Sequence, residues 1–224
     1  ITLIGFILRV IFTPWEISVP SSDSLVFFQE AYNFSNGEFE QISRRVLWPL
    51  IIAFVFIFFK TDNISEYINV MQIISITISS ITIPVVYFFA KHFVTKKYAF
   101  FAVGLFAIEP NIINNSTFTL TEPLFIFLTI LSFYFLLKSN VKGIVISLIF
   151  MGLSFDTRLN AIILPCIIFI ILVFKTRPKK IIFKSLVIGI PILILIMSPY
   201  YLIPNSNFVN QFSSFAEYDE QQIN

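Results

Sequence analysis

The amino-acid sequence predicts an all-α protein: a polytopic bundle of about seven transmembrane helices, with juxtamembrane helices in its first outer loop. Three observations predict this fold. Apolar residues make up 57% of the 224 residues, and charged residues make up only 12%. The apolar residues form long runs, and the charges between the runs are separated by sign. A soluble core does not require so much apolar surface, so these observations exclude a soluble domain.

The apolar runs define the candidate helices. In chain order they cover residues 1–14, 46–59, 67–90, 98–113, 123–137, 141–155, 159–174 and 181–203. A helix rises about 1.5 Å per residue, and the hydrocarbon of a bilayer is about 30 Å thick. The runs 67–90 and 181–203 are therefore long enough to cross, and the first run is expected to be cut short because the chain begins inside it. The run 46–59 would reach only about 21 Å, so we expect it not to cross.

A polar and acidic stretch, residues 15–45, lies between the first two runs. Pro20-Ser21-Ser22-Asp23 predicts the start of a helix, with the second serine as the cap and the aspartate in the first turn. Asn36-Gly37 predicts its end. A short helix of this kind is typical of a bilayer interface, where it would hold the first-turn carboxylate at a fixed depth. Together with the run 46–59, this stretch belongs to a predicted first outer loop, residues 15–66.

The signs of the charges predict the topology. Three loops are purely basic and contain ten of the 15 basic residues: Lys91, Lys96 and Lys97; Lys138 and Lys142; and Lys175, Arg177, Lys179, Lys180 and Lys184. Cytoplasmic loops collect Lys and Arg, so all three loops are expected inside. Two crossings then separate each loop from the next, with outer turns near 114–122 and 156–158. One continuous helix over 141–174 would break this alternation.

The outer face then collects seven charged residues at the ends of different helices. These residues are Asp23, Arg44, Arg45, Glu109, Glu122, Asp156 and Arg158. Ionisable side chains at membrane depth face a water-filled cavity or one another, and they indicate a functional site by default. Structural alternatives stay open: Asp156 and Arg158 could form an ion pair, Arg44 and Arg45 could be interfacial anchors, and Asp23 could be a simple helix-start carboxylate.

Several short motifs occur in a defined order along the chain. They are Ile7-Leu8-Arg9-Val10, Asp23 followed by Ala31-Tyr32 and Asn36-Gly37, Leu47-Trp48-Pro49-Leu50, Val86-Tyr87-Phe88-Phe89-Ala90-Lys91, Ala107-Ile108-Glu109-Pro110, Thr121-Glu122-Pro123, and Gly152-Leu153 leading to Arg158. In order and spacing they resemble the membrane-embedded GT-C glycosyltransferases, in the dolichyl-phosphate-mannose protein mannosyltransferase and aminoarabinose transferase-like group. The resemblance runs from Leu3 to Leu202. Where the mannosyltransferases have a paired Asp-Glu, this chain has Asp23-Ser24.

The resemblance implies a hexosyltransferase of the mannosyltransferase type. It would transfer a sugar from a polyprenyl- or dolichyl-phosphate donor to a protein, lipid or glycan acceptor at the extracytoplasmic face, with inversion. Asp23 would be the general base that takes the proton of the acceptor hydroxyl. Arg158 would hold the phosphate of the donor, with Arg44 or Arg45 as second choice, because a guanidinium binds phosphate oxygens in pairs. Glu122 would orient hydroxyl groups of the acceptor or the sugar.

No cofactor and no metal site are expected. Oligosaccharyltransferases of the same superfamily carry an acidic Asp-x-Asp cluster in the second outer loop, and a hard divalent cation requires several oxygen ligands. Here that loop offers only Glu109 and Glu122. Asp156, which we place among the donor-binding residues, leaves a metal possible. The alternative functions are an oligosaccharyltransferase-like enzyme and a fragment of a multipass transporter.

The expected organisation is a GT-C-like transmembrane module over residues 1–204, followed at 205–224 by the start of an outer loop or C-terminal region. The protein is expected to be an integral multi-pass protein of a cell membrane, most simply a prokaryotic one. Its active site would face the extracytoplasmic side. Its partners would be the lipid-linked donor, the acceptor and membrane lipids, and not nucleic acid.

Overall fold

A computed structural model describes the chain except for residues 16–21, 40–45, 62, 139, 175–177 and 203–224. All regular structure in the described residues is helical. The helices are α1 (Thr2–Phe12), α2 (Ser22–Ser35), α3 (Leu47–Phe58), α4 (Ile64–Ala90), α5 (Lys96–Ile108), α6 (Pro110–Thr117), α7 (Glu122–Leu137), α8 (Val141–Phe155), the short 3₁₀ helix η1 (Leu159–Ile162), α9 (Ile163–Phe174) and α10 (Lys179–Leu202). The predicted all-α class is confirmed.

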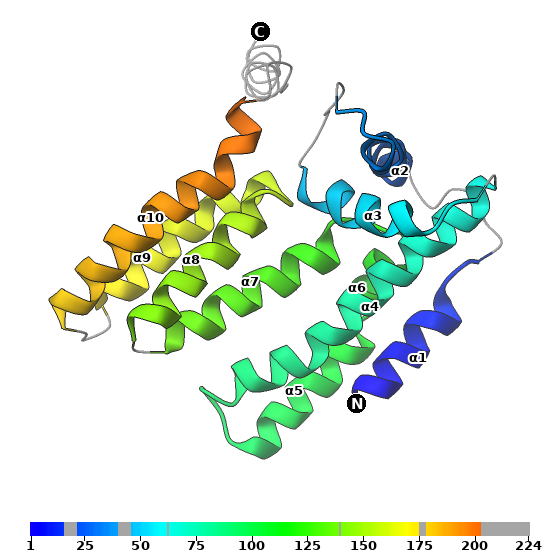
Figure 1. The fold of residues 1–224 in the computed structure, drawn as a ribbon. Helices are drawn as coiled ribbons and strands as arrows, with labels where there is room; N and C mark the ends of the chain where they lie inside the picture. Colours follow the sequence, from blue (N-terminus) through cyan, green and yellow to red (C-terminus); the bar gives the residue numbers. More distant parts are fainter. Residues whose placement is uncertain (16–21, 40–45, 62, 139, 175–177, 203–224) are drawn as a thin grey trace, which may run out of the picture.

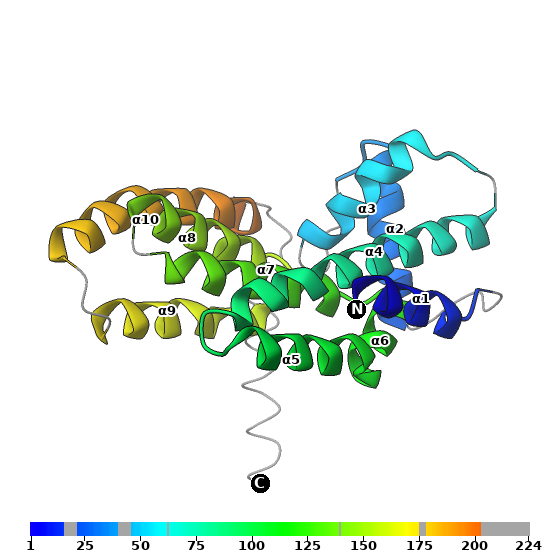
Figure 2. The ribbon, with the colours of Figure 1, turned by 90° about the horizontal axis from the view of Figure 1, so that it is seen from below.

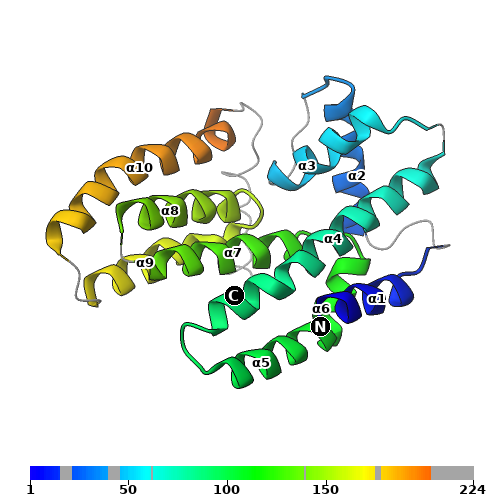
Figure 3. The same ribbon diagram turned by 60° about the horizontal axis from the view of Figure 1, so that its bottom comes forward.

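The helices α4, α7, α8 and α10 lie side by side in a row (Figure 1). The helices α5, α6 and α9 lie on one face of this row (Figure 2). The C-terminal ends of α4, α7 and α9 and the N-terminal ends of α5, α8 and α10 lie at the same end of the molecule, at the lower left of Figure 1. The pair α2 and α3 lies toward the other end, beside the N-terminal half of α4 (Figure 3). The described helix ends that flank the three basic loops are therefore on one side, as is expected if these loops face a single compartment.

The lengths of the described helices support fewer membrane crossings than the roughly seven that the sequence predicts. Among the described residues, only α4 is both long and apolar enough to cross a bilayer by itself. The helices α1, α3, α7 and α8 are apolar but shorter. The helix α3 has 12 residues, which corresponds to about 18 Å, so it is too short to cross, as the length of its apolar run predicted.

The helix ends follow from local chemistry. The Asn63 side chain accepts a hydrogen bond from the backbone N–H of Ser65, which caps α4, and the Asn140 side chain caps α8 by accepting from Gly143. Gly37 follows α2 with a φ of 83°, a conformation that glycine adopts without strain. The predicted ends of these helices are close to the observed ones.

The structure corrects one boundary. The sequence predicts a single run over 98–113 with a turn from residue 114, but α5 ends at Ile108 and a separate helix, α6, begins at Pro110. Glu109 has extended backbone and is the N-cap of α6. A proline at the first position of a helix lacks only an N–H that the helix does not use, so Pro110 favours a new start at this point.

Three apolar clusters hold the bundle together, and the third and smallest joins α4 and α5 around Ile83, Val103 and Ala107. The first joins α2, α3, α7 and the N-terminal half of α4 around the fully buried Trp48 and Ile52. The second joins α7, α8, α9 and α10 around Ile144 and Met151. At the contact of α8 with α10, a Cβ on Gly152 would lie 2.9 Å from the Leu193 side chain, so this glycine favours the close approach of the two helices.

Candidate active site

Asp23 lies in the first turn of α2, as predicted, and it is half-buried. Helical spacing places it on the same face as Phe27, Glu30 and Phe34, all of which are buried. Asp23 is therefore on the inward side of α2. A carboxylate in this position is close to the protein interior and still reached by solvent.

The start of α2 is fixed to a turn that precedes α7. The hydroxyl of Ser24 donates a hydrogen bond of 2.6 Å to the backbone carbonyl of Phe118. The indole N–H of Trp48, in α3, donates one of 3.2 Å to the carbonyl of the next residue, Thr119. The helices α2 and α3 are thus each attached to one of two adjacent carbonyl groups, so the 118–119 turn sets the position of Asp23.

Thr119 has a positive φ of 54°, in the left-handed region that a β-branched residue rarely adopts. A conformation of this kind costs on the order of 1–3 kcal/mol and persists only where the surroundings hold it. Here the bond from Trp48 to its carbonyl and the full burial of Thr119 hold it. Such strain is often found at functional sites.

Glu122 and Arg158 form an ion pair. Glu122 is in the first turn of α7, and Arg158 precedes η1 in the turn that follows α8. Their side chains are 26% and 33% exposed, so solvent reaches both. The Arg158 backbone N–H donates to the carbonyl of Ser154, and Thr157 donates its hydroxyl to the same carbonyl, which fixes the turn. The pair joins two segments that are far apart in the sequence.

This pairing corrects the expected ion-pair alternative. The sequence suggested Asp156 as the structural partner of Arg158, because the two are neighbours, but the ion pair that the structure gives Arg158 is with Glu122. Asp156 is half-buried and caps the end of α8, where its backbone N–H bonds to the carbonyl of Gly152. Arg44 and Arg45 lie outside the described residues.

The carboxylate of Glu109 caps the N-terminus of α6. It accepts a hydrogen bond of 2.7 Å from the backbone N–H of Ile112 and one of 2.8 Å from the Asn111 side chain. The bond from the Ile112 N–H, followed by those from Asn111, lowers the pKa of Glu109 below its ordinary value, against a smaller opposing effect of desolvation. Glu109 is therefore an ionised helix cap.

Arg9 is the residue whose importance the sequence did not reveal, because it entered only as part of a motif. It is fully buried in α1. Its Nε donates to the Ser79 hydroxyl at 2.8 Å, and its Nη1 donates to the carbonyls of Gly5 at 2.8 Å and Ala107 at 3.2 Å. Within the described part of the chain, its Nη2 is buried without a hydrogen-bond partner. The sequence does contain a sign of this role, because Arg9 is the only charged residue in the first apolar run.

A polar strip on α4 connects Arg9 to the site. Gln72, Ser75 and Ser79 are buried at helical spacing on one face of α4. Gln72 donates to the carbonyl of Thr117 at 3.4 Å, one residue before the turn that holds α2. The spacing of these polar residues within an apolar helix could have been recognised from the sequence.

Comparison with known proteins identifies the family. The family model described as dolichyl-phosphate-mannose-protein mannosyltransferase matches residues 46–203, more than half of the chain. The chain belongs to this mannosyltransferase family. The matched segment contains Glu122, Asp156 and Arg158, and it begins after Asp23. No curated protein sequence and no solved structure gives a significant match.

Membership of the mannosyltransferase family confirms the resemblance drawn from the motifs. It indicates a membrane glycosyltransferase that uses a sugar linked to dolichyl phosphate, with a protein as acceptor. Among the described residues, no three His, Cys, Asp or Glu side chains gather as a metal site would require. In this member of the family, the described charged groups of the site are a carboxylate on α2 and an ion pair between α7 and the residue that precedes η1.

Proposed function

We propose that this protein transfers a hexose from a polyprenyl-phosphate carrier to an acceptor hydroxyl at the extracytoplasmic face, with inversion at the anomeric carbon. Asp23 is the general base in this proposal, and Arg158 binds the donor phosphate. One observation carries it. The hydrogen bond from Ser24 to the Phe118 carbonyl brings the helix start with Asp23 onto the segment that leads directly to Glu122 and its partner Arg158.

The chemical step is balanced by these groups. The Asp23 carboxylate takes the proton of the acceptor hydroxyl while its oxygen forms a bond to the anomeric carbon. The bond from that carbon to the phosphate oxygen breaks, and the electron pair stays with the leaving phosphate. A guanidinium stabilises this charge by donating two parallel N–H bonds to phosphate oxygens, which is the role of Arg158.

The ion pair of Arg158 with Glu122 then has a function before the donor arrives. A partly exposed pair contributes about 0–1 kcal/mol, so a lipid phosphate can replace the Glu122 carboxylate at small cost. The released carboxylate can accept hydrogen bonds from hydroxyl groups of the sugar or the acceptor. Glu122 thus keeps Arg158 in place in the empty site and orients substrate in the filled one.

The same arrangement supports transfer without a divalent metal. A hard cation would require several carboxylate oxygens in the outer loops. Glu109 caps α6 and Glu122 is paired with Arg158, so the carboxylates of the 109–122 segment are already engaged. In our proposal the arginine supplies the positive charge that a metal would provide.

The membrane arrangement follows from the charges. The three basic loops face the cytoplasm, about seven helices cross, and α2 and α3 lie along the outer surface. The long α4 and α10 cross in a single piece. The active site then opens to the extracytoplasmic side.

A direct test uses purified protein in detergent with radiolabelled dolichyl-phosphate mannose and a peptide rich in serine and threonine. The expected product is a mannosylated peptide whose anomeric configuration is opposite to that of the donor. Transfer with retained configuration, or no transfer to any hydroxyl acceptor, would contradict the proposal.

A further inference from the structure

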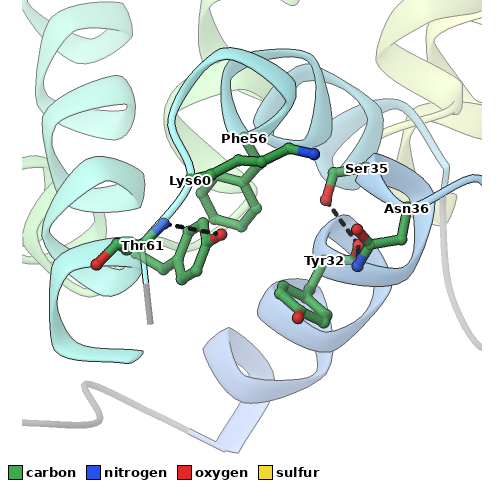
Figure 4. A pocket seen from close by; sticks show the side chains of 7 residues that line it. Tyr32, Ser35, Asn36, Phe56, Lys60 and Thr61 are labelled. Atoms are coloured by element: carbon green, nitrogen blue, oxygen red, sulfur yellow. Dashed lines mark hydrogen bonds between the residues drawn. The ribbon is translucent and has the colours of Figure 1, made fainter. Parts of the chain in front are cut away.

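A pocket lies on the outer loop at the end of α2 opposite Asp23. Its volume is about 250 Å³. Its wall is formed by Tyr32, Ser35 and Asn36 from the end of α2, Phe56 from α3, Lys60 from the following linker, and Tyr67 from α4 (Figure 4). Twelve positions separate Asp23 from Ser35, which on a helix corresponds to about 18 Å. We call this cavity the linker pocket, and it is separate from the proposed active site.

Aromatic rings make one wall of the linker pocket rigid. The ring of Tyr67 lies 4.6 Å from that of Phe56 and 5.8 Å from that of Tyr32, measured between centroids. Tyr67 is only 6% exposed. Its hydroxyl oxygen accepts the backbone N–H of Thr61 at 3.4 Å, so its own O–H remains able to donate. The wall therefore presents a fixed hydroxyl donor rather than a mobile side chain.

The polar groups of the pocket suit an anion. In Figure 4 the Lys60 ammonium, the Ser35 hydroxyl and the Asn36 amide lie around the hollow, and Tyr67 also lines it. The amide of Asn36 is held in place by a bond of 3.2 Å to the Tyr32 carbonyl. Of the described residues that line the pocket, one is a cation and none is a carboxylate. A ligand with negative charge and several acceptor oxygens complements this set.

The surface beside the pocket is apolar. Leu50, Phe54, Ile57 and Phe58 are 40%, 64%, 49% and 76% exposed and form a stripe along α3. The stripe ends two residues before Lys60. An apolar helix face that ends in a lysine is typical of a helix in the membrane interface, with the ammonium at the level of the lipid head groups.

We propose that the linker pocket binds the phosphate of a membrane phospholipid, whose acyl chains lie along the exposed stripe of α3. The phosphate accepts hydrogen bonds from Lys60 and from the Tyr67 hydroxyl. The bound lipid holds α2 and α3 at a fixed depth in the outer leaflet. This site is distinct from the donor site at Arg158, and it requires no transfer reaction.

The test measures lipid binding to the whole protein by native mass spectrometry in detergent. The probes are phosphatidylglycerol, a galactosyl diacylglycerol without phosphate, and inorganic phosphate as competitor. The variants are Lys60→Gln, which removes the charge, Lys60→Arg, which keeps it, and Tyr67→Phe, which removes only the hydroxyl. Lys97→Gln, an exposed lysine of a basic loop, is the matched control.

We expect Lys60→Gln to weaken phosphatidylglycerol binding roughly tenfold and Tyr67→Phe to weaken it several-fold, as loss of a charge-assisted and of a neutral hydrogen bond would. Lys60→Arg and Lys97→Gln should stay within about threefold of the native protein. If Lys60→Gln weakens binding of the galactolipid as much as it weakens binding of phosphatidylglycerol, the pocket does not recognise the phosphate, and the proposal is overturned. If millimolar inorganic phosphate displaces bound phosphatidylglycerol as effectively as added lipid does, the pocket is a site for free phosphate, and the proposal is also overturned. Unchanged lipid binding in Lys60→Gln and Tyr67→Phe would do the same.

Discussion

The ion pair of Arg158 with Glu122 gives the most quantitative prediction. If Arg158 binds the donor phosphate, Arg158→Ala removes hydrogen bonds to a charged group, which contribute about 1.5–3 kcal/mol. Donor affinity should therefore fall about 10- to 150-fold. Arg158→Lys keeps the charge and loses the paired geometry, so its loss should be clearly smaller.

Glu122→Gln should act in the opposite direction. The carboxylate competes with the phosphate for the guanidinium, and a pair that is about one-third exposed contributes at most about 1 kcal/mol. Removing the competing charge should tighten donor binding by up to about fivefold. The same substitution should lower the rate of transfer, because Glu122 no longer orients the hydroxyl groups as a charged acceptor.

Filter binding of radiolabelled dolichyl-phosphate sugar to the detergent-purified variants measures these affinities, and thermal unfolding controls for stability. Both substitutions should change the stability by no more than about 1 kcal/mol. The reasoning is wrong if Arg158→Ala binds donor as the native protein does. It is also wrong if Glu122→Gln weakens binding as much as Arg158→Ala, since the pair would then be a structural unit.

Three further predictions concern the rest of the chain. Arg9→Met should lower the thermal stability of the protein by about 2–4 kcal/mol, because three buried hydrogen bonds of about 0.5–1.5 kcal/mol are lost; unchanged melting in detergent would show that Arg9 has no structural role. A cysteine at Thr176 should resist a membrane-impermeant thiol reagent in intact cells, while a cysteine at Asn115 should react. Labelling of the cysteine at Thr176 from outside would show that the proposed topology is wrong. The lowered pKa of Glu109 means that its cap stabilises α6 above the ordinary pKa of Glu, about 4.3, and is lost as the pH falls through the folded-state value. The protection factor of the Ile112 amide against hydrogen exchange, which corrects for the intrinsic pH dependence of exchange, should fall on acidification in the native protein and stay constant in Glu109→Gln.

The helix pattern could be predicted because its signals are local. Asn36-Gly37 at the end of α2 and the polar break at Asp156 after α8 are both read from a few neighbouring residues, and the structure confirms both. The separate helix α6 was missed because Ile112 and Ile113 continue the apolar run of α5. The competing signal, a proline after Glu109, marks a helix start as readily as an end.

The sequence could predict which residues belong to the candidate site, but not which of them contact one another. Glu122 and Arg158 are 36 positions apart, and only the packing of α7 against α8 brings them together. The bond from Ser24 to the Phe118 carbonyl spans 94 positions, and no local pattern indicates it. The sequence left an ion pair of Asp156 with Arg158 open as one alternative, because neighbouring residues are the only ones whose distance a sequence reveals.

The central claim is that Asp23 is the general base, and single-turnover transfer by Asp23→Asn tests it most directly. The amide keeps the size of the side chain and removes its basicity, so the rate should fall roughly 10²- to 10⁴-fold while donor binding stays native. Glu66→Gln is the matched control, because Glu66 is also a first-turn carboxylate, at the start of α4, and should be dispensable. An Asp23→Asn variant that keeps more than about a tenth of the native rate would contradict the account, since a helix-start carboxylate contributes only about 1 kcal/mol to stability and nothing to proton transfer.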